Sequence, residues 1–125
     1  MQIIDHACQP RAHLPGIEHR TLACADDGLA TLSLWQQSLD ASAATPPHRH
    51  DCEEVVVVTA GCGTLHLGDE VRAFGPGMTL VIPRGVEHQI VATGPGALEL
   101  IAAFGATPVG TFAPDGAPLE LPWRT

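Results

Sequence analysis

The chain has 125 residues, a formal net charge of −8 and no lysine, and its six positive side chains are arginines scattered along the sequence. At this length one hydrophobic core is expected. Scattered arginines exclude the basic stripe of a nucleic-acid-binding protein, and no apolar run approaches the about 18 residues that span a bilayer. With four cysteines but no C-x-x-C pair, we expect reduced thiols and a cytoplasmic protein that binds neither nucleic acid nor membranes.

The first third of the chain predicts an extended arm followed by a hairpin. Residues 1–19 mix charged, Pro and His residues without a sustained period and are typical of an arm. Two β-like segments follow at 20–25 and 30–39, separated by the turn signal Asp-Asp-Gly at 26–28. We expect these two segments to pair with each other.

Six further β-like segments follow, each bounded by turn residues such as Gly, Pro or Asp: 54–61, 62–68, 71–74, 79–82, 88–92 and 98–104. No long stretch holds apolar residues at helical spacing without an intervening Gly or Pro. Short strands of this kind must close into a barrel or pair as a sandwich, because free edges invite association. We predict an all-β jelly-roll barrel, with the tail 105–125 packing either on the barrel or on a second subunit.

The sequence HRHDCEE, residues 48–54, stands at the start of a strand that continues with four valines. Residues two apart on a strand point to the same face, so three donors can project into one cavity: His48, His50 and Glu54. The alternate residues are expected to face solvent: Arg49, Asp51 and Glu53. Two imidazoles and a carboxylate suit a divalent metal ion. Solvated, unliganded residues at the mouth of a barrel are the alternative.

A second stretch, residues 77–92, supplies a third nitrogen donor. Pro83 and Gly85 predict a turn between two strands, and the strand after it begins with His88. His88 shares its face with the small and apolar residues of that strand. Its ring is therefore expected to face inward.

These two stretches resemble the two motifs of the cupin superfamily. The first motif is G, five residues, H-x-H, three or four residues, E, six residues, G, and the second is G, five residues, P-x-G, two residues, H, three residues, N. The chain matches them at these positions: His48, His50, Glu54, Gly61, Gly77, Pro83, Gly85 and His88. Ser42 and Ala92 stand where the motifs have Gly and Asn. Neither is a ligand position, so the two departures concern only turn geometry and a cross-strand hydrogen bond.

The resemblance covers residues 42–104 and implies a double-stranded β-helix, the cupin form of the jelly roll. We expect one domain over residues 1–125, with an N-terminal arm at 1–19 and a C-terminal tail at 105–125. The resemblance also implies one divalent transition-metal ion per chain, and the ligand set does not choose among Fe, Mn, Ni, Zn and Cu. The implied ligands are His48, His50, Glu54 and His88. Because cupins commonly pair through an arm strand, a homodimer is expected.

Several other residues have both a functional and a structural interpretation. Cys52 lies on the ligand face, where it either approaches the site or fills the core. Arg84 in the Pro-Arg-Gly turn either pairs with an anionic substrate or stays solvated, and His66 is expected to be exposed. Trp35 and Phe104 are expected in the core rather than as a platform for substrate. The histidines of the arm are expected on the surface or at an interface: His6, His13 and His19.

The favoured function is that of a metal-dependent enzyme acting on a small organic molecule, with dioxygenase-type chemistry ahead. Four protein ligands leave positions open on an octahedral ion, where a substrate or dioxygen binds. The chain contains no Tyr and no Lys, which disfavours cupin epimerases and lyases that use a Tyr acid or base. A metal-dependent decarboxylase or isomerase is an alternative, as is a non-catalytic small-molecule-binding or sensing barrel.

Overall fold

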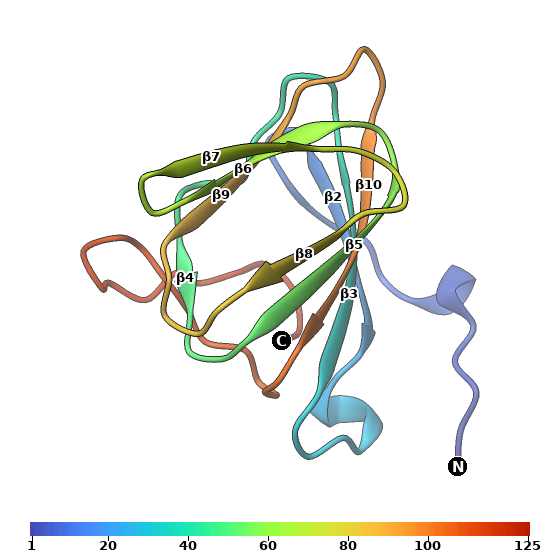
Figure 1. Cartoon of the computed structure of the whole chain (residues 1–125). Coiled ribbons are helices and arrows are strands. Elements are labelled where there is room, and N and C mark those ends of the chain that lie inside the picture. Colours follow the sequence, from blue (N-terminus) through green and yellow to red (C-terminus); the bar gives the residue numbers. More distant parts are fainter.

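Strands form nearly all of the regular structure, as the sequence predicts. The computed structural model describes residues 1–125 and contains single turns of 3-10 helix at His6–Cys8 (η1) and Ala25–Asp27 (η2) (Figure 1). The strands are β1 (Ala12–Leu14), β2 (Ile17–Ala23), β3 (Ser33–Leu39), β4 (Arg49–His50), β5 (Glu54–Ala60), β6 (Gly63–Leu67), β7 (Glu70–Phe74), β8 (Thr79–Ile82), β9 (His88–Ala92), β10 (Leu98–Phe104) and β11 (Thr111–Phe112).

The strands form two facing layers. The larger layer is a six-stranded antiparallel sheet in the order β1-β2-β3-β10-β5-β8. The smaller layer contains the three-stranded sheet β7-β6-β9 and the pair β11-β4. Backbone hydrogen bonds between residues 43–48 and β9 join these two pieces edge to edge. The result is the predicted jelly roll, in which β6, β7 and β9 cross over the larger sheet (Figure 1).

The predicted hairpin forms from β2 and β3, which pair antiparallel and are joined through η2. β2 starts earlier than expected, at Ile17, because the chain turns at Gly16 and pairs β1 with β2. Residues 12–19 therefore belong to the large sheet, and the predicted extended arm is wrong for this part.

Strand alternation turns one face of each layer into the core. Along β10, every second side chain is buried, and the same holds for the first five residues of β5. A cluster of 16 buried residues fills the space between the layers, and each large apolar member stabilises the fold by about 1.5–3 kcal/mol through burial. Val56 and Val58 belong to this cluster and continue the face on which Glu54 stands. The core therefore supports one side of the candidate site directly.

Two turn positions of the first cupin motif, 42 and 61, have a left-handed backbone conformation, and only position 42 departs from the glycine of the motif. Ser42 stands where the motif has glycine and adopts a left-handed φ of 68°, a conformation that costs a non-glycine residue about 1–2 kcal/mol. Gly61 has a φ of 81°, and a Cβ there would clash with the Ala97 carbonyl oxygen. Glycine is thus sterically required at position 61, whereas serine keeps the turn at position 42 at a modest cost.

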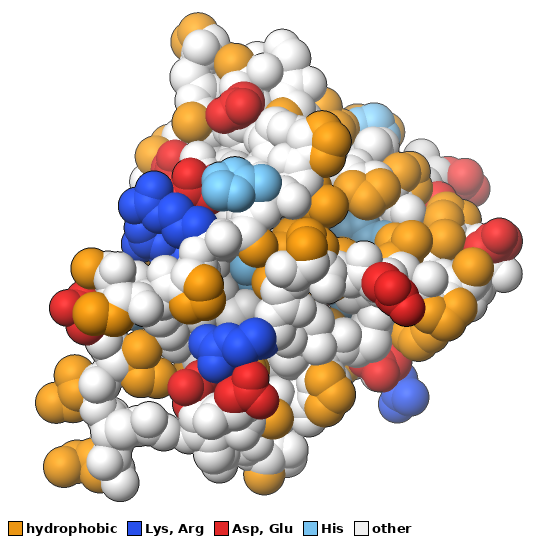
Figure 2. Space-filling view, turned by 180° about the vertical axis from the view of Figure 1, so that it is seen from behind, with side chains coloured by type: hydrophobic (Ala, Val, Ile, Leu, Met, Phe, Trp, Pro, Cys, Tyr) orange, Lys and Arg blue, Asp and Glu red, His pale blue; other side chains and the backbone are white.

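Charges of both signs are interspersed on the surface. On the face shown in Figure 2, arginine side chains stand in small separate groups beside acidic ones. Two such ion pairs are Arg11–Glu18 at 3.4 Å and Arg124–Asp26 at 3.5 Å. None of the helical segments has the length and apolar character required to cross a membrane.

Candidate metal centre

His48 and His88 oppose each other across two paired segments. The His48 N–H donates to the His88 carbonyl oxygen (3.0 Å), and the His88 N–H donates to the His48 carbonyl oxygen (2.8 Å). Side chains of directly opposed residues in an antiparallel pair lie on the same face. The two rings accordingly lie together, with their centroids 4.3 Å apart.

His50 and Glu54 join this pair from the ends of two consecutive strands. β4 ends at His50, a bend follows at residues 51–52, and β5 begins with Glu54. Both side chains are buried, with relative exposures of 4% and 6%. Glu54 Oε2 lies 3.4 Å from His50 Nε2 and 3.1 Å from His88 Nε2. The inward orientation that strand alternation predicts is observed for both residues.

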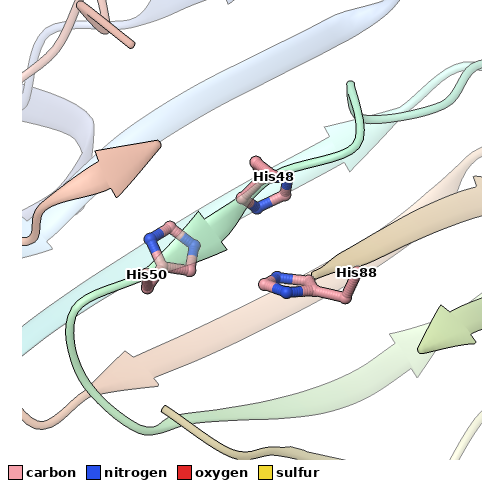
Figure 3. Close-up of side chains that lie close together, drawn as sticks. All are labelled: His48, His50 and His88. Atoms are coloured by element: carbon pink, nitrogen blue, oxygen red, sulfur yellow. The ribbon is translucent and has the colours of Figure 1, made fainter. Parts of the chain in front are cut away.

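The three histidine rings converge (Figure 3), and each offers a donor nitrogen within 4.8 Å of the other two. Neighbouring donors around an ion with bonds of about 2.1 Å stand about 3.0 Å apart in an octahedron and about 3.4 Å apart in a tetrahedron. The two separations from Glu54 fall in this range. The histidine nitrogens lie within 4.8 Å of one another, so a bound ion would draw the more distant of them closer together.

Each ring is oriented by a hydrogen bond on its far side. Nδ1 of His48 lies 2.6 Å from the Pro46 carbonyl oxygen, and Nδ1 of His88 lies 2.9 Å from that of Val86. Nδ1 of His50 lies 3.2 Å from the Gly110 carbonyl oxygen and 3.1 Å from Thr111 Oγ1. A carbonyl oxygen can only accept a hydrogen bond, so these contacts place a hydrogen on Nδ1 of each ring. In the neutral ring the lone pair on Nε2 is then free to bind an ion.

Two buried polar atoms at the centre of this group have no hydrogen-bond partner: Glu54 Oε2 and His88 Nε2. In the neutral Nδ1–H tautomer, His88 Nε2 presents a lone pair to the carboxylate oxygen 3.1 Å away. Two acceptors that face each other in a dry interior cost about 1–3 kcal/mol each. A proton on His88 Nε2 or a cation between the two atoms removes this conflict, and the donor set fits a divalent transition-metal ion.

Burial keeps two of the three rings in the neutral state that binds a metal ion, whereas His88 is shifted the other way. Burial lowers the pKa of His48 to about 4, and the neighbouring His88 adds to the shift. Burial also lowers the pKa of His50, although the charge of Glu54 opposes it. For His88 burial acts in the same direction, but the close contact and charge of Glu54 outweigh it and raise the pKa. His48 and His50 are thus neutral near pH 7, the state in which imidazole is a ligand.

A cavity with a volume of about 50 Å³ adjoins the four donors. Its wall is mainly apolar and includes Trp35, Ile90, Phe104, Leu119, Leu121 and Trp123. Besides the four donors, the polar residues that line it are Gln37, Thr45 and Thr111. The site therefore combines a cluster of metal donors with a small apolar chamber.

Residues 35–104 match the family described as cupin domain, which is more than half of the chain. The chain belongs to the cupin family. The match includes every residue that the sequence predicts as a metal ligand, and it begins at Trp35 in the wall of the cavity.

Three proteins illustrate what this chain is similar to in sequence or in fold. Auxin-binding protein 1 of Arabidopsis thaliana is 34% identical over 109 residues, which cover 78% of this chain and only 54% of the plant protein. The polyketide cyclase RemF of Streptomyces resistomycificus superimposes with a TM-score of 0.75 at 24% identity, covering 87% of this chain and 83% of the cyclase. A mutant of Bacillus subtilis oxalate decarboxylase gives a TM-score of 0.75 at 18% identity over 82% of this chain and 29% of that chain. At these identities the two structures show a common fold.

The structure places four other residues of this cupin for which the sequence left two interpretations. Cys52 is buried in the core cluster and does not line the cavity, and burial raises its pKa to about 11, so it is an apolar filler. Arg84 is exposed and lies outside the cavity wall. Trp35 and Phe104 belong to the core and also line the cavity.

The sequence missed the role of His19. It was expected on the surface or at an interface, but it is 1% exposed and stacks on Trp123 with ring centroids 3.8 Å apart. Thr21 Oγ1 donates to the Arg124 carbonyl oxygen (2.6 Å) and therefore accepts from His19 Nε2–H (2.9 Å). Gln37 Nε2 donates to the other ring nitrogen (3.1 Å). This neutral ring fixes the tail of the chain, which packs on its own barrel and closes one side of the cavity.

The neutral state of His19 predicts a dependence of stability on pH. Burial lowers its pKa from 6.5 to about 3, and the unfolded chain takes up a proton near 6.5. The unfolded state therefore binds more protons between these values, and the free energy of unfolding falls as the pH is lowered from 6.5 towards 3. The His19 contribution to the slope is at most about 1.4 kcal/mol per pH unit.

Urea denaturation of the metal-free protein at a series of pH values measures this effect. His19→Gln removes the titrating ring, so its stability should depend less steeply on pH than that of the wild type over the same range. Parallel curves for the two proteins would show that His19 is not the group responsible.

Proposed function

We propose that this cupin binds one divalent transition-metal ion per chain and uses it to bind a small organic molecule in the adjoining cavity. The proposed ligands are His48, His50, Glu54 and His88. The observation that carries the proposal is the convergence of three histidine donor nitrogens, within 4.8 Å of one another, on the buried Glu54 carboxylate, whose Oε2 lies 3.4 Å from His50 Nε2 and 3.1 Å from His88 Nε2. A divalent cation would bind all four groups at once.

The donor set limits the metal to a class. Three imidazole nitrogens and one carboxylate oxygen suit Fe, Mn, Ni, Zn or Cu. Such an ion, when bound, acts as a Lewis acid towards an oxygen atom of the organic molecule. The protein's own contribution is to hold the three rings by their Nδ1 atoms and to keep the surrounding wall apolar.

The cavity favours a molecule with one oxygen-donor group and an apolar remainder. No Lys or Arg lines the wall, so an anionic oxygen has no partner there other than the ion and a few neutral polar groups. The volume of about 50 Å³ admits only a few heavy atoms, whereas benzene occupies a cavity of about 150 Å³ in a well-studied case. We therefore propose a small carboxylic acid, or a larger one that displaces the wall formed by Leu119 and Leu121.

Binding without turnover and catalysis at the metal both begin with this complex. The first is supported by the auxin-binding relative and by the cavity itself, because Gln37, Thr45 and Thr111 do not exchange protons near neutral pH. Dioxygenase-type chemistry is the second candidate, supported by the coordination positions that four protein ligands leave open. Decarboxylation or isomerisation would need the same open positions. We place binding without turnover first, because Gln37, Thr45 and Thr111 do not exchange protons near neutral pH.

The metal site is tested by replacing His88 with Ala. Wild-type protein purified without chelator should contain about one transition-metal ion per chain by elemental analysis. Zinc at 100 times its dissociation constant should raise the free energy of unfolding by about 2.7 kcal/mol. His88→Ala should lose most of this stabilisation, because the substitution removes one ligand and β9 then offers Glu54 no nitrogen partner.

His66→Ala is the matched control for this experiment. His66 lies partly buried on β6, beside β9, and its ring contacts Thr64 Oγ1 at 3.3 Å. Zinc titration calorimetry and thermal melting should leave this variant close to wild type. If His88→Ala bound zinc as tightly as His66→Ala, the proposed ligand set would be wrong.

The organic ligand is tested with carboxylic acids of increasing size, from acetate to benzoate and phenylacetate. Calorimetry should detect binding to zinc-loaded protein and none to metal-free protein, because the ion holds the carboxylate. Leu121→Ala should improve binding of the ring-containing acids relative to acetate, since removing part of the wall enlarges the cavity. Equal binding with and without zinc would contradict a role for the ion.

Oxygen consumption by iron-loaded protein separates the second candidate from the first. β-Diketones, flavonols and small thiols are the substrates to offer. Oxygen uptake that depends on one of them would favour dioxygenase chemistry over binding alone.

We also propose that the protein forms a homodimer. Val55 and Val57 on β5 and Val81 on β8 expose 39%, 43% and 68% of their surface, and Val55 pairs with Val81 across the two strands. A second copy would cover this apolar patch. Light scattering should then give twice the chain mass of 13.1 kDa, and a monomer at working concentration would contradict the proposal.

A further inference from the structure

Asp51 lies in the bend between the two strands that carry His50 and Glu54. Its side chain is exposed, and strand alternation gives it no role in the site. The structure nevertheless ties it to the tail of the chain. Asp51 Oδ1 accepts a hydrogen bond from the Gly110 N–H (3.0 Å), and the Asp51 N–H donates to the Gly110 carbonyl oxygen (3.3 Å).

The carbonyl held by Asp51 is also the one that faces His50. Nδ1 of His50 lies 3.2 Å from the Gly110 oxygen. The side chain and backbone of Asp51 thus fix both polar groups of Gly110, and one of these groups orients the ring of His50. The neighbouring Thr111 adds its hydroxyl to the same nitrogen at 3.1 Å.

The close approach of Asp51 depends on the absence of a side chain at position 110. A Cβ on Gly110 would lie 2.5 Å from Asp51 Oδ2 and 2.7 Å from its Cγ. The carboxylate therefore packs directly against the Gly110 backbone. A side chain at position 110 would push the carboxylate away, so this contact requires the glycine.

The same bend is fixed at a second point. The Gly105 N–H donates to the Glu53 carbonyl oxygen (3.1 Å), and Cys52 between the two contacts is buried in the core. Residues 51–53 are thus held on both sides of Cys52 by the segment that follows β10. Because this bend separates His50 from Glu54, its geometry sets the distance between the two side chains.

We propose that Asp51 is a positioning residue for the metal site: through Gly110 it orients His50 and fixes the spacing of His50 from Glu54. This inference rests on the metal site proposed above. Partners that orient a metal-binding histidine typically change metal affinity by about 10- to 100-fold when they are removed. The same loss is expected here, although Asp51 touches no metal ligand directly with its side chain.

The test compares Asp51→Ala, Asp51→Asn and Asp69→Ala in the full-length chain. Asp51→Ala removes the acceptor for the Gly110 N–H, whereas Asp51→Asn keeps an oxygen in that position. Asp69→Ala is the control, because Asp69 is an exposed aspartate in the turn between β6 and β7 and carries the same charge. Cobalt(II) is the probe, since both its affinity and its visible absorption spectrum report on the ligand geometry.

We expect Asp51→Ala to bind cobalt about 10-fold or more weakly than wild type, with an altered absorption spectrum. Asp51→Asn should recover most of the affinity and the wild-type spectrum, and Asp69→Ala should match wild type. Nitrogen-15 NMR of the metal-free proteins should show the Nδ1–H tautomer of His50 in wild type and a mixture of tautomers in Asp51→Ala. A purely structural role would lower the melting temperature without changing the spectrum or the tautomer.

Two outcomes would overturn different statements. Wild-type protein that binds no cobalt would overturn the metal site. Wild-type protein that binds cobalt while Asp51→Ala and Asp69→Ala share its affinity and spectrum would overturn only the role of Asp51. If Asp51→Ala does not fold, Asp51→Glu replaces it, because the longer side chain keeps the charge and misplaces the oxygen. Weaker cobalt binding by that variant supports the inference, and unchanged binding overturns it.

Discussion

The pairing of residues 43–48 with β9 is the constraint on which the candidate site depends. Two backbone hydrogen bonds of 3.0 and 2.8 Å hold His48 directly opposite His88. The two rings come from segments far apart in the sequence, and without this register no local pattern would bring them together. A shift by one residue would turn one ring out of the cavity, because side chains alternate along a strand.

Burial of the donors destabilises the metal-free site and would strengthen the binding of a metal ion. His50, Glu54 and His88 are each less than a tenth exposed, and removing water from such groups is unfavourable unless they find partners. The Nδ1 atoms have partners in the backbone, but two of the atoms that face the centre, Glu54 Oε2 and His88 Nε2, have no hydrogen-bond partner. Metal binding would therefore stabilise the fold itself, because it satisfies groups that the fold has already desolvated.

Much of the fold follows from local signals in the sequence, and the exceptions are long-range contacts. The predicted bounds of β8, β9 and β10 agree with the structure because Gly and Pro turns delimit each strand. Alternation also gave the inward orientation of His50, Glu54 and His88. His19 was misplaced because its burial comes from Trp123, at the other end of the chain. The contact of Asp51 with Gly110 was missed for the same reason, since alternation correctly assigns Asp51 to the outer face and says nothing about the tail.

The tail links the two functions proposed for the site. Leu119, Leu121 and Trp123 form part of the cavity wall, and two earlier residues of the same tail, Gly110 and Thr111, contact Nδ1 of His50. A ligand large enough to displace this wall would pull on the segment that contacts His50. If the proposed site binds both an ion and an organic molecule, the size of the molecule and the affinity for the ion would be coupled through this stretch of backbone.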